Sequence, residues 1–328
     1  MTTTATAPAA ARQLSQLEAD LLTACLHHRL LTTEQLRALL APQVGLRWLQ
    51  ALTRRLAGAG MLAHVADRDA RRSRPRLVWY VTAAGRAAVQ HLVHERRHTM
   101  TAEKAANALQ RHTLIGNDVG IAFARHAQRL GHYCGPYDWD HEVGHRYGHT
   151  PRVNTVVPDL LVRCWLRHDG GDTLLTRFVE IDRGRYSPLV LRNKIRGYAE
   201  LLTYTGVAAA PAAPAPRPVW TRVYPVFPKL LIVFADQSPA AAGRRIEVLA
   251  DLCRTDPLIR RHLPTLWLGC AHLDQVVDDG PYAPIWRTPL AAGPVDLLAE
   301  PPAGDVVELA PGLRHKRAAG ERQPRRHR

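Results

Sequence analysis

The sequence contains few cysteines and no long apolar run. Its five cysteines are scattered, and none stands close enough to another to form a C-x-x-C pattern, so neither a metal or redox motif of that kind nor a disulfide framework is expected. No apolar run approaches the roughly 20 residues that a membrane-spanning helix needs, and residues 1–11 lack the charged and apolar blocks of a secretory signal. We therefore expect a reduced, cytoplasmic protein without a membrane partner.

Several common catalytic signatures are also missing. The chain has no Walker loop, no glycine fingerprint of a dinucleotide-binding fold, and no tyrosine set beside a histidine cluster in the manner of a relaxase. The sequence therefore gives no support to a P-loop NTPase, to a Rossmann-type oxidoreductase or to a covalent tyrosyl mechanism.

Positive charge, by contrast, is abundant. Lys and Arg outnumber Asp and Glu by 44 to 29 among 328 residues, which gives a net charge of +15, and Arg dominates. A surplus of this size attracts polyanions, of which nucleic acid and anionic membrane are the nearest candidates. The length of the chain allows two domains.

The first hundred residues show helical and then strand-like periodicity, followed by a further helix that opens at Thr82. The expected elements are helices at 15–30, 32–40 and 45–57 and strands at 61–66 and 77–82. The order helix, helix, helix, hairpin, helix is that of a winged helix-turn-helix domain, which we place at residues 13–92.

The third of these helices carries a polar face suited to DNA. Arg47, Gln50 and Arg54 recur opposite its apolar residues, where Arg and Gln can reach base edges in a major groove. The loop 67–76 between the strands holds five arginines, and those assigned to DNA contacts are Arg71, Arg72, Arg74 and Arg76. Because phosphate contacts would supply most of the affinity, binding should depend strongly on salt. The alternative is a protein-docking winged helix with a solvated Arg-rich loop.

Beyond residue 110, helices and strands alternate, which predicts a mixed α/β domain with a central mixed sheet over residues 111–300. Two apolar runs in this domain end in carboxylates, at 157–160 and 178–182. Buried carboxylates need a compensating positive charge, and a divalent cation commonly supplies it. The expected elements are helices at 112–130, 188–204 and 239–254 and strands at 156–165, 174–181, 230–234 and 265–268. The remaining segments are a disordered N-terminus (1–12), a helical connector (93–110) and a basic disordered tail (301–328).

These carboxylates carry a resemblance to known proteins. Pro158-Asp159 followed by Glu180-x-Asp182 resembles the PD-(D/E)xK nuclease core, and the order of motifs over roughly residues 15 to 290 resembles the replication-relaxation family of actinobacterial plasmids. The motifs are Tyr80-x-Thr82-x-x-Gly85, His112 with Asn117-Asp118, Pro158-Asp159, Glu180-Ile181-Asp182-Arg183-Gly184, Lys194 near Tyr198, and Gly280-Pro281 leading to Trp286. The resemblance implies a winged helix followed by a PD-(D/E)xK-like α/β domain, with a role in plasmid replication and DNA relaxation.

In the nuclease core that the resemblance implies, Asp159 and Glu180 would bind Mg²⁺ or Mn²⁺, and a lysine two residues after the glutamate would steady the attacking water. Asp182 stands at that lysine position instead, on the same strand face as Glu180, and is assigned as a third metal ligand. Helical spacing places Lys194 on the sheet-facing side of the helix 188–204, where it would replace the missing lysine. Arg183 is a second, weaker substitute. Alternatively, Lys194 only neutralises buried carboxylates in a domain that does not cut.

A run of three histidines, His141, His145 and His149, raises the question of zinc. Neighbouring glycines and Pro151 favour a loop or hairpin over a helix, so the three rings would not share one face. Zinc is therefore not expected, and a loop that faces phosphates is favoured.

We interpret the sequence as a two-domain DNA-binding protein of the replication-relaxation type, from a plasmid or mobile element, whose nuclease-like domain is non-catalytic. The expected partners are double-stranded DNA, other replication or plasmid-transfer proteins, and a second copy of the chain in a homodimer. Two alternatives stay open. One is a Mg²⁺-dependent nickase or endonuclease with Glu180 and Lys194 as catalytic residues; the other is a winged-helix transcriptional regulator.

Overall fold

The computed structural model describes residues 13–67, 76–92, 100–107, 110–149, 152–206 and 217–298. Arg71, Arg72 and Arg74 of the predicted Arg-rich loop lie outside these residues, as do the predicted disordered ends at 1–12 and 301–328. The predicted mixed α/β class is confirmed, since helices accompany a five-stranded mixed sheet and smaller sheets.

The N-terminal unit (residues 16–92) has the predicted order of three helices, a hairpin and a helix, with one short strand added between the first two helices. Its elements are α1 (Gln16–His28), β1 (Leu31–Thr32), α2 (Thr33–Leu40), α3 (Leu46–Gly58), β2 (Leu62–Ala66), β3 (Leu77–Val81), α4 (Ala83–Val89) and the 3-10 helix η1 (Gln90–Leu92). Ser15 caps α1 through a capping box with Glu18, and Thr82 caps α4. The three strands form a sheet of order β1-β3-β2 that packs on α1 and α3.

The C-terminal unit (residues 110–298) is built on a sheet of order β10-β9-β8-β7-β4, in which β8, β9 and β10 run parallel and β7 and β4 alternate in direction. Its strands are β4 (Trp139–His141), β5 (His145–His149), β6 (Arg152–Val156), β7 (Leu160–His168), β8 (Gly171–Asp182), β9 (Lys229–Phe234) and β10 (Gly269–His272). Its helices are α6 (Gln110–Arg129), α7 (Pro188–Thr203), the 3-10 helix η2 (Val219–Arg222), α8 (Pro239–Thr255), α9 (Pro257–Leu266) and α10 (Leu273–Asp278). The short helix α5 (Ala102–Ala105) lies between the two units in the chain.

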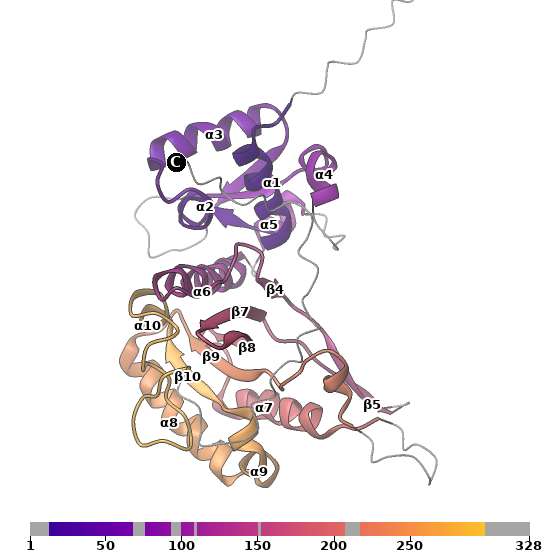
Figure 1. Cartoon of the computed structure of the whole chain (residues 1–328), viewed down its shortest axis with the longest axis vertical. Helices are drawn as coiled ribbons and strands as arrows, with labels where there is room; N and C mark the ends of the chain where they lie inside the picture. The colour runs from indigo at the N-terminus through magenta and orange to yellow at the C-terminus, as the bar shows by residue number, and fades with distance from the viewer. Residues whose placement is uncertain are drawn as a thin grey trace, which may run out of the picture.

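Alternate side chains along the strands pack on opposite faces of the sheet, and each face is covered by its own helices. In β8, Phe178 packs with α7, α8 and α9, whereas Val179 packs with α6 and α10. Figure 1 shows the result, in which the N-terminal unit rests on α6 and the sheet separates α6 from α7, α8 and α9. Because side chains alternate with period two, Glu180 and Asp182 share the face of Phe178 and lie between the sheet and its outer helices.

Two predicted strands differ from those observed. The run at 156–165 is divided, since β6 ends at Val156 and pairs with β5 in a separate hairpin, while β7 begins after Pro158, which lacks the N–H that a ladder needs. The strand predicted at 265–268 is wrong, because these residues finish α9 and lead through the left-handed Trp267 into β10. Short apolar runs of this kind do not distinguish a buried strand from the buried end of a helix.

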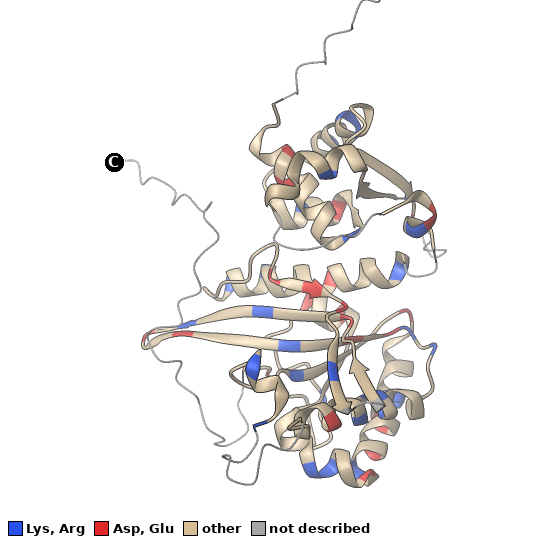
Figure 2. Cartoon of the chain, turned by 90° about the vertical axis from the view of Figure 1, so that its right-hand side faces the viewer, with Lys and Arg blue, Asp and Glu red and all other residues tan. Residues whose placement is uncertain are grey.

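Figure 2 shows β7 and β8 continuing past the sheet as a two-stranded ribbon.

The two units are joined by buried polar contacts on α6. The Asn117 side chain is fully buried; its Nδ2 donates to the Leu30 carbonyl at 2.6 Å, and its Oδ1 lies 2.9 Å from His141 Nε2. Gln35 of α2 donates to Asp118 Oδ1 at 2.7 Å. Since buried polar groups are costly to separate from their partners, these contacts fix the N-terminal unit on the C-terminal unit. Asn117-Asp118 thus serves the junction between the units.

Candidate functional site

Asp159, Glu180 and Lys194 come together where β7 begins and the central strand β8 ends. The register pairs Leu160 of β7 with Val179 of β8, so Asp159 lies directly beside Glu180. Lys194 reaches them from α7, which begins at Pro188 with Ser187 as its N-cap, as the sequence predicted. We call these residues, with the adjoining His112 and Tyr198, the carboxylate–lysine cluster.

Glu180 lies at the centre of the cluster and its side chain is only 4% exposed. The Lys194 ammonium donates a hydrogen bond to Glu180 Oε2. The Tyr198 hydroxyl, also buried, donates to Glu180 Oε1 at 2.5 Å. Both oxygens of this carboxylate therefore accept a hydrogen bond from α7, which satisfies a group that would otherwise be costly to bury.

Asp159 is held from the other side. Its Oδ2 accepts the backbone N–H of Ile181 at 2.7 Å, and its Oδ1 lies 3.2 Å from His112 Nε2 on α6. The Lys194 ammonium is 3.8 Å from the same Oδ1. One lysine thus faces two neighbouring carboxylates, and its side chain is still 40% exposed to solvent.

The surroundings shift the pKa values of the two carboxyl groups in opposite directions. Burial and the charge of Asp159 raise the pKa of Glu180 to about 8, against the opposing effects of Lys194 and Tyr198. Burial would also raise the pKa of Asp159, but His112 and Lys194 outweigh it and hold that pKa below its ordinary value. Burial would lower the pKa of Lys194, whereas the two carboxylates raise it. At neutral pH the cluster therefore contains a charged Asp159 and a charged Lys194. The pKa of Glu180, about 8, lies close to this pH.

Asp182 has partners of its own. Its side chain is completely buried; Oδ1 accepts the Gly184 N–H at 3.0 Å, and Oδ2 accepts a hydrogen bond from Arg245 Nη2 of α8 at 2.5 Å. Arg245 Nη2 also donates to the Tyr186 carbonyl at 2.6 Å. Although Asp182 shares the strand face of Glu180, its oxygens are committed to Arg245 and to the loop that leads into α7. Arg183, the weaker substitute for the missing lysine, instead pairs with Asp236 at 2.7 Å.

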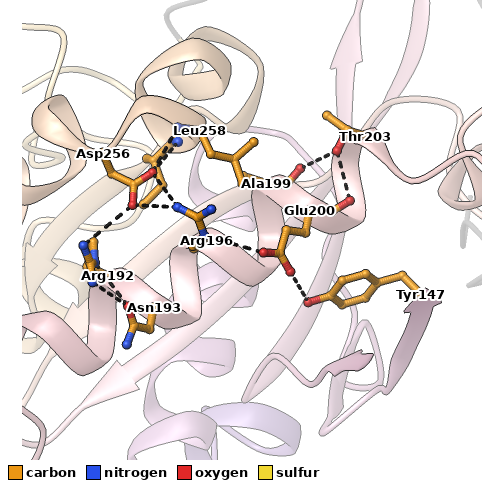
Figure 3. A network of polar contacts seen from close by, with 10 residues as sticks. Tyr147, Arg192, Asn193, Arg196, Ala199, Glu200, Thr203, Asp256 and Leu258 are labelled. Atoms are coloured by element: carbon orange, nitrogen blue, oxygen red, sulfur yellow. Dashed lines mark hydrogen bonds and ion pairs between the residues drawn. The ribbon is translucent and has the colours of Figure 1, made fainter. Parts of the chain in front are cut away.

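The outer face of α7 is braced by a second polar network, drawn in Figure 3. Arg196 contacts Asp256 at 3.1 Å, and Asp256 in turn caps α9. Further along α7, Glu200 accepts a hydrogen bond from the Tyr147 hydroxyl of β5 at 3.0 Å. These contacts tie α7 to its neighbours and so fix the helix that carries Lys194 into the cluster.

The predicted DNA-contacting residues are spread over α3 and the base of the hairpin. Arg47 and Arg54 are exposed and Gln50 is half-buried, while the apolar residues of α3 face the core. Gln50, Arg54 and Arg76 line a hollow of about 170 Å³. The Arg76 side chain pairs with the buried Asp67 at 2.8 Å. In Figure 1, α3 lies on the side of the N-terminal unit away from α6, which agrees with the exposure of Arg47 and Arg54.

The histidine run is divided between different partners. His141 contacts Asn117, and His145 Nε2 lies 2.6 Å from the Tyr224 hydroxyl. His149 ends β5, in the hairpin that the neighbouring glycines predicted. Over the described part of the chain, no three His, Cys, Asp or Glu side chains gather as they would around a metal ion.

Three residues around the site are not assigned to it from the sequence, although His112 and Tyr198 stand among the motifs that carry the family resemblance. Tyr198 belongs to the apolar stripe of its helix, yet a buried tyrosine hydroxyl needs a hydrogen-bond partner, and that requirement is the signal that the sequence offers. His112 and Arg245 come from other elements, and no spacing in the sequence links them to Asp159 or Asp182.

These features define a mixed α/β protein with a helical, hairpin-bearing N-terminal unit fixed on a sheet that carries a buried carboxylate–lysine cluster. Residues 22–217 match the family model described as replication-relaxation, and the chain belongs to that family. The family description points to a role in the replication or relaxation of DNA. No curated protein and no solved structure matched the chain. Among the residues that the structure describes, no helix is long and apolar enough to cross a membrane.

Proposed function

We propose that the protein binds double-stranded DNA through its N-terminal unit and acts in the replication or relaxation of a plasmid or other mobile element. The observation that carries this proposal is the accessible face of α3, where Arg47, Gln50 and Arg54 lie opposite the buried core residues. In a winged helix-turn-helix the corresponding helix enters the major groove. The net charge of +15 would add a large, salt-dependent attraction to phosphate. A second copy of the chain and other replication or plasmid-transfer proteins are the protein partners that we propose.

In this proposal the C-terminal unit is a nuclease-like scaffold that does not cut DNA. Glu180 accepts hydrogen bonds on both oxygens, and Asp159 is held by His112 and the Ile181 N–H. With Lys194 between them, the two carboxylates form an ion cluster that the protein neutralises by itself. The position two residues after Glu180 belongs to Asp182, whose charge is committed to Arg245.

Duplex binding tests the first part of the proposal. We expect Arg54→Ala to weaken binding by about 1–3 kcal/mol if it contacts a base, and to lower the salt slope by about one if it contacts a phosphate. Gln50→Ala should change the preferred sequence, because a glutamine bidentate to adenine discriminates between bases. The measurement is fluorescence anisotropy with duplex libraries at several salt concentrations.

The matched control for Arg54→Ala is Arg260→Ala, which removes an exposed arginine from α9 in the C-terminal unit. Equal losses in the two variants would mean that general charge, rather than α3, binds DNA. A uniform loss in Gln50→Ala across all sequences would show contact with the backbone alone.

A Mg²⁺- or Mn²⁺-dependent nickase is the second candidate, and the position of Lys194 favours it. The ammonium lies beside Glu180 and Asp159, where it could hold a water molecule for attack on a phosphodiester. Two adjacent carboxylates suit a hard divalent cation, whereas Asp182 suits it poorly, since both of its oxygens are occupied. When bound by Asp159 and Glu180, such an ion would supply Lewis acid chemistry and activate water.

Supercoiled plasmid distinguishes the two candidates. Under the proposed function, we expect wild type with Mg²⁺ or Mn²⁺ to bind the plasmid and leave it intact. Nicked or linear product that disappears in Glu180→Gln would instead establish the nickase, because this substitution removes the charge and keeps the shape. Agarose gel electrophoresis of the relaxed, linear and supercoiled forms reads the outcome.

A further inference from the structure

Tyr186 is an exposed aromatic residue on a rigidly held loop. Its side chain is 56% exposed, yet its carbonyl accepts a hydrogen bond from Arg245 at 2.6 Å. The same loop turns at Gly184, which adopts a positive φ of 75° and donates its N–H to Asp182. Ser187, the residue after Tyr186, caps α7. The backbone is therefore fixed on both sides of Tyr186 while its ring remains accessible.

The surroundings of the ring combine apolar and cationic groups. Val190 and Lys194 follow Tyr186 at intervals of four residues, and Val190 is 47% exposed. The Tyr186 carbonyl is joined through Arg245 to Asp182, which lies two residues along the same strand face from Glu180, the partner of Lys194. Arg185 is exposed on the same loop. An accessible aromatic ring with cations beside it is the arrangement that binds single-stranded nucleic acid.

A purely structural role would use the ring differently. A residue directly before the N-cap of a helix often packs against the fourth helical residue, here Leu191, as a hydrophobic staple. Leu191 is buried, but a staple needs only an apolar side chain and would not leave more than half of Tyr186 in solvent. A staple would therefore not account for the exposed face of the ring.

We infer that Tyr186 is a stacking platform for an unpaired DNA base beside the carboxylate–lysine cluster, so that the C-terminal unit binds single-stranded DNA. The inference rests on the proposed DNA binding and extends it from duplex to strand-separated DNA. Bases within a duplex are stacked on each other and cannot reach such a ring without being extruded. Arg185, which is exposed on the same loop, would attract a phosphate beside the stacked base.

The test uses the full chain and oligothymidylates that carry a single 2-aminopurine at successive positions. Stacking on the ring should quench the 2-aminopurine emission at one or more positions in wild type. Tyr186→Phe keeps the ring and should retain both the quenching and the affinity. Tyr186→Leu keeps an apolar residue for the staple but removes the ring, and should weaken single-strand binding by roughly tenfold and abolish quenching.

Two controls separate the possible failures. Tyr133→Leu removes another exposed tyrosine, one that pairs with Trp165, about 17 Å along β7 from Leu160, and it should leave quenching unchanged. Duplex affinity, measured in parallel, should be the same in all variants. Absence of duplex binding in wild type would refute the proposed function. Duplex binding without quenching in wild type, or with equal single-strand affinity in wild type and Tyr186→Leu, would overturn the role of Tyr186.

Discussion

Changing Arg245 to methionine is expected to destabilise the protein by about 3–5 kcal/mol, because it leaves the buried charge of Asp182 without its cation. Asp182 is completely buried and Arg245 is 21% exposed, so solvent cannot replace the lost partner. The same substitution frees the Tyr186 carbonyl, which Arg245 also binds. Urea denaturation followed by circular dichroism would give the difference in the free energy of unfolding.

The neighbouring Arg244 supplies the control, since it is exposed on the same helix. Arg244→Met should change the free energy of unfolding by no more than about 0.5 kcal/mol. Combining Arg245→Met with Asp182→Asn should recover much of the loss, because the second change removes the uncompensated charge. If Arg245→Met were as mild as Arg244→Met, the pair would not hold the loop, and Asp182 would be available for another role such as metal binding.

This ion pair also fixes the loop between β8 and α7, which carries the Tyr186 ring that we propose as a stacking platform. Asp182 binds the loop through Gly184, and Arg245 binds it through the Tyr186 carbonyl. Asp182 and Arg245 thereby shape the entrance to α7. If the C-terminal unit is the nuclease-like scaffold that we propose, the residue that replaces the expected lysine is the one that fixes this loop.

Local periodicity explains what the sequence predicted well. The alternation along β8 placed Glu180 and Asp182 on one face, and the helical spacing of α7 placed Lys194 toward the sheet. Ser187 and Pro188 marked the start of α7. In each case the relevant neighbours lie within one element, so three-dimensional packing was not needed to infer their direction.

Packing between distant elements explains what the sequence could not provide. Arg245 reaches Asp182 only because α8 and α7 cover the same face of the sheet. His112 reaches Asp159 from α6, on the opposite side. Spacing in the sequence carries no information about such pairs, and without them Asp182 resembled a free ligand. The strand predicted at 265–268 failed for a related reason, since burial alone does not specify secondary structure.

Lys194→Met should destabilise the protein by about 2 kcal/mol at pH 8, less than for a fully buried pair because the Lys194 side chain is 40% exposed. Without the ammonium, Asp159 loses a cationic partner, and a Glu180 that gives up its proton repels Asp159 across the strand pair. Adding Glu180→Gln should restore most of the stability, because it removes the group that can ionise beside Asp159 and keeps an oxygen for the Tyr198 hydroxyl. Recovery in the double variant is the signature of charge neutralisation.

The pH dependence provides the independent check. The pKa of Glu180 is raised from 4.5 to about 8 in the folded protein, so the native state keeps a proton that the unfolded chain has lost. The stability that this proton contributes is fully present below pH 4.5 and is lost as the pH rises through about 8. Wild type should therefore lose stability across this window, with a slope of at most about 1.4 kcal/mol per pH unit, whereas Glu180→Gln should give a flatter curve.

In Lys194→Met the loss of the positive charge should raise the pKa of Glu180 further and move the decline to higher pH. Unfolding curves at about pH 4, 6 and 9, which bracket the expected window, would measure these slopes for wild type and the two single variants. A Lys194→Met protein as stable as wild type at every pH would contradict the neutralising role. If that variant also lost a metal-dependent nicking activity seen in wild type, Lys194 would be catalytic, since its charge would then serve the reaction and not the fold.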